Sequence, residues 1–288
     1  MHVLVNGVKL FFDVEGAKLV PDSAVMREKP TLLLLHGGPG FDHTSFKPAY
    51  GALADTAQLI YLDHRGNGRS DAGDKAKWTL AQWGDDVAAF CDALGIVKPI
   101  VLGVSFGGMV AQAYATRHPG HPAKLILVST MASGNAHRDR AVERFTQLGG
   151  PEVGELARRR FLENRGNSDL AAVEAWRRLA MPHYTRRPRD PNAVARTLAR
   201  PEMLHHFSRP GGEGLSFDML ADLKRIACPT LVLGGEDDPM TPIECQADIA
   251  AAIPRHLVRF ERFANAGHGI VHDVPEALQT IRSFVTER

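Results

Sequence analysis

The sequence predicts an α/β fold, in which a mostly parallel sheet is covered by helices on both faces. Short apolar runs without polar alternation recur along the 288-residue chain, as expected of strands buried on both faces. Stretches with helical periodicity separate these runs, and strands that alternate with helices favour a parallel sheet. The length suits one large domain, or a core domain with an insertion.

The chain opens with a predicted hairpin, because residues 3–5 and 8–14 flank the turn-forming pair Asn6-Gly7. Six further strands are expected, at residues 31–35, 58–62, 100–104, 125–129, 230–233 and 256–260. Helices are expected at residues 80–94, 108–117, 243–253 and 275–286. Together with the hairpin, these runs predict an eight-stranded sheet flanked by helices.

The alternation breaks between residues 131 and 222, where the chain has helical periodicity, many arginines and no lysine. Because this stretch lies between two core strands, we expect a helical cap inserted over the carboxyl edge of the sheet, where open α/β sheets bind ligands. Residues 1–130 and 223–288 would form the core. Two arginine clusters, at 158–160 and 186–187, could attract an acidic substrate, but interspersed acids favour solvated helix faces.

Charge and composition argue against several classes of protein. The formal net charge of +1 gives no reason to expect a nucleic acid or membrane partner. No apolar run is long enough for a transmembrane helix, and residues 1–14 lack the pattern of a signal peptide, so we expect a cytoplasmic location. The three cysteines, Cys91, Cys228 and Cys245, fit neither a disulfide framework nor a zinc site. No metal or nucleotide cofactor is expected.

Residues 103–107 spell Gly-Val-Ser-Phe-Gly, which matches the pattern G-x-S-x-G between a predicted strand and a predicted helix. This context is typical of a nucleophile elbow, a sharp turn that exposes a serine hydroxyl at its tip. Ser105 is therefore the candidate nucleophile. The alternative is an ordinary glycine-rich turn in which the serine caps the helix.

A serine hydroxyl needs a base to accept its proton. His268 is the candidate base, because it follows the last predicted strand, as the order serine, acid, histidine requires, and because small residues surround it. His256 and His272 compete by position. We interpret them as surface or capping groups, since His256 opens the predicted strand and His272 lies at the start of the next helix.

The acid should follow the next-to-last strand, where Glu236, Asp237 and Asp238 compete. One carboxylate suffices to orient an imidazole. Asp238 is favoured, because it lies three residues after Gly235 and four before Pro242. The alternative is a turn that caps the following helix.

Two backbone amides should stabilise the oxyanion. One belongs to Phe106, the residue after the nucleophile. The other is assigned to Gly38 in the loop His36-Gly37-Gly38-Pro39-Gly40, since glycines let a backbone amide approach a ligand closely. We interpret His36 as a residue that bonds this loop. Asp63 and Arg65, in the polar run 63–70, are interpreted as structural ion-pairing groups beside the site.

These motifs together resemble those of the α/β-hydrolase superfamily along nearly the whole chain, with the inserted cap most divergent. The resemblance implies a serine hydrolase with a Ser105–His268–Asp238 triad, no cofactor, and a small molecule or short peptide as substrate. It says little about which substrate.

Within the superfamily, the His-Gly-Gly-Pro-Gly loop and the Arg-Gly-Asn-Gly-Arg-Ser run resemble the proline iminopeptidases, which release N-terminal proline from small peptides. Those enzymes tend to carry Gly-Gly-Ser-Trp-Gly at the elbow and use cap carboxylates to hold the substrate's ammonium group. The corresponding cap acids here would come from Glu152, Glu155, Glu174, Glu202 and Glu213. The run Ser105–Val110 is closer to small esterases and lactonases, which remain the alternative. A lyase, or a binding module with no turnover, is a more distant one.

Overall fold

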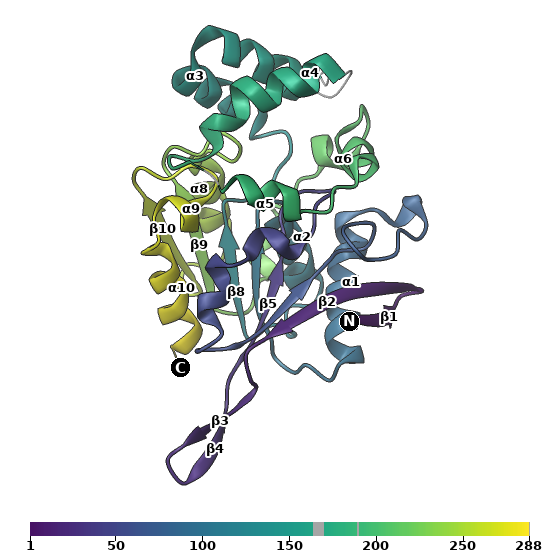
Figure 1. The fold of residues 1–288 in the computed structure, drawn as a ribbon, viewed down its shortest axis with the longest axis vertical. Helices are drawn as coiled ribbons and strands as arrows, with labels where there is room; N and C mark the ends of the chain where they lie inside the picture. Colours follow the sequence, from purple (N-terminus) through teal and green to yellow (C-terminus); the bar gives the residue numbers. More distant parts are fainter. Residues whose placement is uncertain (164–169, 189, 288) are drawn as a thin grey trace.

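An eight-stranded sheet runs through the centre of the molecule in the computed structural model, which describes residues 1–163, 170–188 and 190–287 (Figure 1). The strand order is β1-β2-β6-β5-β7-β8-β9-β10. Antiparallel pairing is confined to β1 with β2 and β2 with β6, and the remaining neighbours in this sheet are parallel. The predicted mostly parallel eight-stranded sheet is confirmed.

The strands lie close to the predicted ranges. Their bounds are β1 His2–Val5, β2 Val8–Glu15, β5 Thr31–Leu35, β6 Gln58–Leu62, β7 Ile100–Val104, β8 Lys124–Val128, β9 Thr230–Gly235 and β10 Val258–Phe263. The last strand was predicted at 256–260, which is too early. Because β10 is an edge strand that pairs with β9 alone, it carries Glu261 and Arg262 without burying them fully, and the apolar pattern misses its end.

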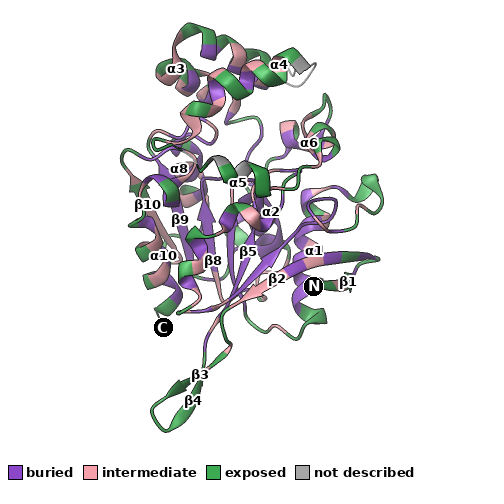
Figure 2. Cartoon of the chain, viewed as in Figure 1, coloured by how far each residue is buried: buried purple, intermediate pink, exposed green. Residues whose placement is uncertain are grey.

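Successive side chains of the central strands enter two different cores, because side chains alternate across a sheet. In β5, Leu33 and Leu35 pack with α1 (Leu80–Ala93), α2 (Phe106–Arg117) and α8 (Ile243–Ala252). Leu32 and Leu34 pack on the opposite face with α9 (Ile270–Asp273) and α10 (Ala277–Thr286). Figure 2 shows the resulting buried strands between helices whose outer faces are exposed. Burial on both faces explains the unbroken apolar runs.

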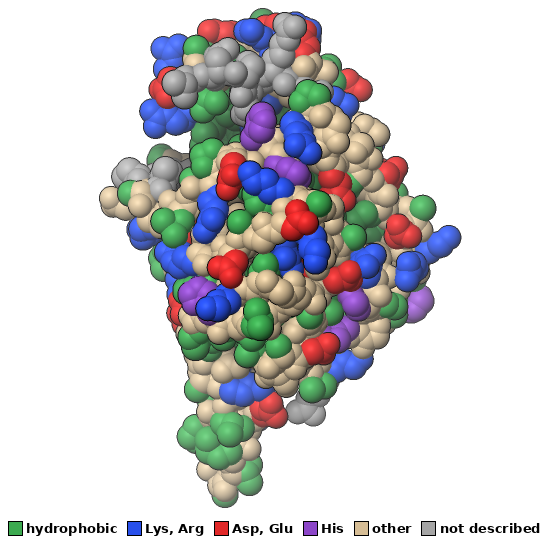
Figure 3. All heavy atoms as spheres, turned by 90° about the vertical axis from the view of Figure 1, so that its right-hand side faces the viewer, with side chains coloured by type: hydrophobic (Ala, Val, Ile, Leu, Met, Phe, Trp, Pro, Cys, Tyr) green, Lys and Arg blue, Asp and Glu red, His purple; other side chains and the backbone are tan. Residues whose placement is uncertain are grey.

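A second, two-stranded sheet joins β3 (Leu19–Asp22) to β4 (Val25–Glu28) in a hairpin that projects from the body (Figure 1). Figure 3 shows hydrophobic side chains gathered on this hairpin, at the bottom of the view. Three of its apolar side chains are more than half exposed: Leu19, Val25 and Met26. Neither strand buries a face, so the hairpin has no hydrophobic alternation by which the sequence could have predicted it.

The segment between β8 and β9 is helical. It contains α3 (Arg138–Phe161), α4 (Leu170–Ala175), α5 (Pro191–Arg196), α6 (Pro201–Ser208) and α7 (Glu213–Ser216). Its two ends run side by side through the isolated bridge Ser133–Asp218. We call residues 131–222 the inserted segment. In Figure 1, α3 and α4 lie beyond the sheet at one end of the molecule. Within the described residues, no helix is both long and apolar enough to span a membrane.

A buried histidine at the start of α3 predicts a pH-dependent stability. His137 is 5% exposed, its Nδ1 donates to Gly134 O at 2.9 Å, and burial lowers its pKa to about 4. The unfolded chain binds this proton near pH 6.5, so this contribution to stability is present above pH 6.5 and is lost as the pH falls towards 4. A gap of that size corresponds to ~3 kcal/mol.

We expect His137→Asn, whose amide keeps the bond to Gly134, to flatten the loss of unfolding free energy between pH 6.5 and 4. Urea unfolding at several pH values measures the slope. His256→Asn is the matched control, because His256 is exposed. Equal slopes for wild type and His137→Asn would contradict the assignment.

Candidate active site

Ser105 lies at the tip of a sharp turn between β7 and α2. Its backbone has φ 55° and ψ −118°, outside the regions that non-glycine residues ordinarily adopt. The turn needs glycine on both sides, because a Cβ on Gly103 would collide with Gly107 O and one on Gly107 would collide with Leu35 O. This local requirement explains why the five-residue pattern is visible in the sequence.

Hydrogen bonds hold the turn from beneath. Ser105 N donates to Val128 O at 2.9 Å, and Thr130 Oγ1 donates to Ser105 O at 2.7 Å. Gln246, fully buried on α8, donates in turn to Thr130 O at 2.6 Å and to Thr241 O at 3.1 Å. The backbone of Ser105 is therefore tied, through Thr130 and Gln246, to the loop that follows β9.

The three predicted triad residues lie within hydrogen-bond distance in the predicted order. His268 Nε2 is 3.0 Å from Ser105 Oγ, and His268 Nδ1 is 2.9 Å from Asp238 Oδ2. The imidazole is 14% exposed and the carboxylate is fully buried. The residues follow β7, β9 and β10, so the carboxyl edge of the sheet brings together groups up to 163 positions apart.

Among the three competing acids, only Asp238 contacts His268. Its Oδ1 accepts from Met240 N at 2.8 Å and from Thr241 N at 3.0 Å, and its Oδ2 also accepts from Thr241 Oγ1 at 2.8 Å. Asp237 is partly exposed with its carboxylate 3.6 Å from Arg186, and Glu236 is exposed. The hydroxyl of Thr241 was missed, because a threonine three residues after an aspartate is too common a signal.

Among the three candidate histidines, the one that hydrogen-bonds to Ser105 Oγ is His268. His256 is exposed before β10 rather than opening it, so its predicted place in the strand is wrong. His272 lies in the short helix α9, and its Nε2 donates to Pro188 O at 3.0 Å.

The loop that follows β5 lies against Ser105, because a Cβ on Gly37 would be 3.4 Å from Ser105 Cβ. Gly38, the next residue, has φ +123°, a conformation that favours glycine. Phe106 is the first residue of α2, and the first amides of a helix have no carbonyl partner within it. Both candidate oxyanion donors therefore border Ser105, the candidate nucleophile.

Two buried histidines lie behind this loop. His36 Nδ1 donates to Gly37 O at 2.7 Å, and His36 Nε2 accepts from His64 N at 3.3 Å. This pattern fixes a neutral tautomer, and burial lowers the pKa of both imidazoles. His36 thus bonds the loop, as the sequence suggested. Nε2 of His64 is buried without a hydrogen-bond partner among the described residues.

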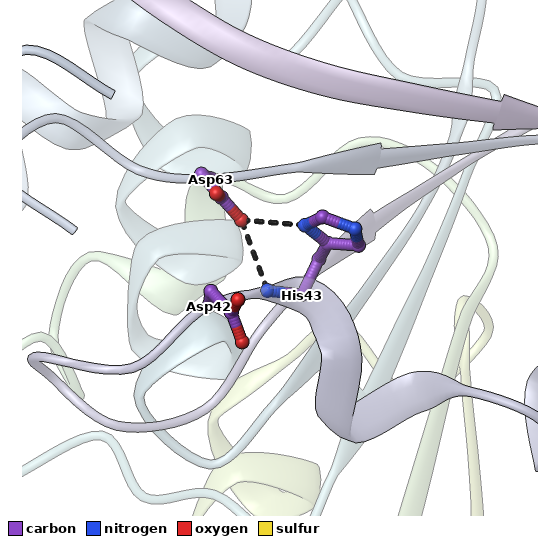
Figure 4. A group of neighbouring side chains, drawn as sticks. All are labelled: Asp42, His43 and Asp63. Atoms are coloured by element: carbon purple, nitrogen blue, oxygen red, sulfur yellow. Dashed lines mark hydrogen bonds and ion pairs between the residues drawn. The ribbon is translucent and has the colours of Figure 1, made fainter. Parts of the chain in front are cut away.

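The polar run after β6 supplies two buried side chains with close partners, Asp63 and Arg65. Asp63 Oδ1 accepts from His43 N at 2.9 Å and His43 Nδ1 at 2.7 Å (Figure 4). Burial alone would raise the pKa of Asp63, but the hydrogen bonds that its carboxylate accepts from His43 and from Arg69 N outweigh burial and lower the pKa to about 2. Arg65 forms a buried ion pair with Asp86, in which Nε donates to Oδ2 at 2.7 Å and Nη2 donates to Oδ1 at 2.8 Å.

Asp42, His43 and Asp63 are near enough to share a metal ion, but all four carboxylate oxygens of Asp42 and Asp63 already accept hydrogen bonds. The Arg69 guanidinium donates to Asp42 Oδ2 at 2.6 Å, and Arg69 N donates to Asp63 Oδ2 at 2.9 Å. A cation is thus supplied by the chain itself, and the cluster fits a structural network rather than a metal site.

The five acids of the inserted segment differ in their surroundings. Glu155, Glu174 and Glu202 form exposed pairs with Arg158, Arg177 and Lys75, and Glu152 is exposed. Glu213 is half-buried, accepts from Leu80 N at 2.7 Å, and has its pKa raised by burial.

The arginines of the cluster at 158–160 have different surroundings. Arg158 forms exposed ion pairs with Glu155 and Glu163. The Arg160 guanidinium, by contrast, lies 4.5 Å from the centre of the Trp176 ring.

The chain belongs to the alpha/beta hydrolase fold family, whose model matches residues 30–275. It is 30% identical over 263 residues to the "Putative carbamate hydrolase RutD" of Caulobacter vibrioides, covering 88% of this chain and 90% of that one. It is 29% identical to the proline iminopeptidase of Lactobacillus delbrueckii subsp. lactis, covering 84% of each. The crystal structure of a proline iminopeptidase from Mycobacterium smegmatis superposes with a TM-score of 0.79 at 27% identity, covering 99% of this chain and 97% of that one.

Proposed function

We propose that this protein is a serine hydrolase that cleaves a small ester, lactone or amide through an acyl-enzyme. The observation that carries the proposal is the continuous hydrogen-bonded series from Ser105 Oγ through His268 to the buried carboxylate of Asp238. A serine with a base within hydrogen-bond reach, and an acid that orients the base, is the arrangement that activates a hydroxyl for acyl transfer.

In the first half of the reaction, Ser105 Oγ adds to the acyl carbon and its proton passes to His268 Nε2. The carbonyl electron pair moves to oxygen, and the amides of Gly38 and Phe106 stabilise that charge. Asp238 stabilises the imidazolium through Nδ1. When the carbonyl re-forms, the leaving group departs with the proton from His268, and the acyl group remains on Ser105.

In the second half, water gives a proton to His268 Nε2 while its oxygen adds to the acyl carbon. Collapse of this intermediate releases the acid, and Ser105 Oγ takes back the proton from His268. The inserted segment, as the proposed cap, supplies the groups that select the substrate. The cycle consumes water and needs no other reactant.

The similarity to proline iminopeptidases supports a proline amide as substrate. An esterase or lactonase without peptidase activity is the second candidate. The esterase interpretation is favoured because Glu155, Glu174 and Glu202 already pair with cationic side chains. Of the five acids in the inserted segment, a clamp for the ammonium group of a proline substrate would then depend on the half-buried Glu213.

Parallel turnover assays with proline p-nitroanilide, p-nitrophenyl acetate and p-nitrophenyl butyrate test the proposal. We expect both esters to be cleaved, because activated esters need little beyond the triad and the oxyanion donors. Release from the proline amide, with a KM raised by Glu213→Gln but unchanged by Glu152→Gln, would favour the iminopeptidase. Esters alone would favour the second candidate. Absence of turnover on all three would contradict a serine hydrolase and point to a binding module or a lyase.

A further inference from the structure

The inserted segment runs along the loop that carries His268. His268 N donates to Tyr184 O at 2.6 Å, and a Cβ on Gly267 would collide with that same carbonyl. A Cβ on Gly269 would be 2.9 Å from Thr185 Cγ2. The small residues on both sides of His268 thus admit a second stretch of backbone.

A buried carboxylate joins the two stretches. Asp273, at the end of α9, is 2% exposed. Its Oδ2 accepts from Gly267 N at 2.8 Å, while its Oδ1 accepts from Arg186 N at 2.9 Å and from Arg187 N at 3.1 Å. Three amides from two chain segments converge on one side chain. A carboxylate suits this position, because it only accepts hydrogen bonds and offers lone pairs to all three.

These bonds act on the backbone at the candidate base. The amide before the imidazole, Gly267 N, is held by Asp273 directly. The amide of His268 itself is held by Tyr184 O, which belongs to the stretch that Asp273 fastens two residues later. Asp238, by contrast, contacts the imidazole ring.

We propose that Asp273 is a positioning residue for His268, and that it makes the geometry of the base depend on the inserted segment. This inference rests on the proposed function, in which His268 accepts the serine proton. Loss of the Asp273 carboxylate would release the backbone of the His268 loop and that of the inserted segment beside it. A displacement of about 1 Å at a reacting group can lower the rate by about 10²-fold.

The test is Asp273→Asn, which keeps the size of the side chain but turns one acceptor into an N–H donor facing other donors. We expect kcat for p-nitrophenyl butyrate to fall by about 10- to 100-fold while KM changes by less than about threefold, because the substitution displaces His268 and leaves the groups that bind the substrate unchanged. Asp74→Asn is the matched control, because Asp74 is an exposed aspartate whose carboxylate accepts from Ala76 N at 2.9 Å.

A second pair of variants leaves Asp273 intact. Arg187→Pro removes one amide that donates to Asp273, and Arg187→Ala removes the exposed side chain alone. We expect a fall in kcat for the first and wild-type kcat for the second. Thermal unfolding identifies which variants are folded. Wild-type kcat in folded Asp273→Asn would overturn the inference.

The low-field proton resonance of the His268–Asp238 hydrogen bond separates this inference from the proposed function. We expect this resonance in the wild type, and its broadening or loss in Asp273→Asn. If the wild type showed no turnover that depends on Ser105, the proposed function would fail. An unchanged resonance in Asp273→Asn would then still count against a positioning role.

Discussion

Ser105→Ala is expected to lower kcat/KM by roughly 10⁵-fold on any substrate that the wild type cleaves, because it removes the hydroxyl that lies 3.0 Å from His268 Nε2. The variant should fold normally, since the bonds that hold the turn come from the backbone of Ser105 and from Thr130. Initial rates and thermal unfolding measure the two quantities.

A fluorophosphonate probe gives a second readout of the same prediction. It should label the wild type once and fail to label Ser105→Ala. Ser23→Ala is a suitable control, because Ser23 also has a positive φ, of 57°, but lies exposed in the turn of the β3–β4 hairpin. If Ser105→Ala kept its turnover, the acyl-enzyme mechanism would be wrong.

The second large effect is expected at the acid. Asp238→Asn should lower kcat by about 10⁴-fold, because an asparagine amide can donate to His268 Nδ1 and so stabilise the tautomer that cannot accept the serine proton. Asp237→Asn should stay close to wild type, since Asp237 is partly exposed and faces Arg186. Steady-state kinetics of the two adjacent variants compare them directly. A larger loss at Asp237 than at Asp238 would reverse the assignment of the acid.

The sequence predicted features that depend on local geometry. Gly103 and Gly107 are required by one tight turn, and the elbow pattern records that requirement within five residues. The buried strands were predicted for a similar reason, because burial on both faces imposes an apolar run. The order of the three candidate triad residues followed from the topology of the sheet, which the alternation of strands and helices made visible.

Other features depend on contacts between distant parts of the chain and left no local pattern. The bonds of Thr130 to Ser105 and of Gln246 to Thr130 join residues 25 and 116 positions apart. In the sequence, Asp273 looks like an ordinary acid at the end of a helix. Its bonds to the amides of Arg186 and Arg187 form only because the inserted segment folds back against α9. The exposed β3–β4 hairpin has no buried face, so hydrophobicity could not predict it.

The adjacent ends of the inserted segment have an evolutionary consequence. Gly134 N donates to Phe217 O and Met219 N donates to Ala132 O, each at 2.8 Å, so the chain leaves the core and returns to it at nearly one point. Because the closure entropy of a loop grows only slowly with its length, such an excursion can lengthen, shorten or diverge at little expense to the stability of the sheet. Under the proposed function, in which this segment selects the substrate, changes in specificity can accumulate there, and they are most restricted where the segment contacts the His268 loop.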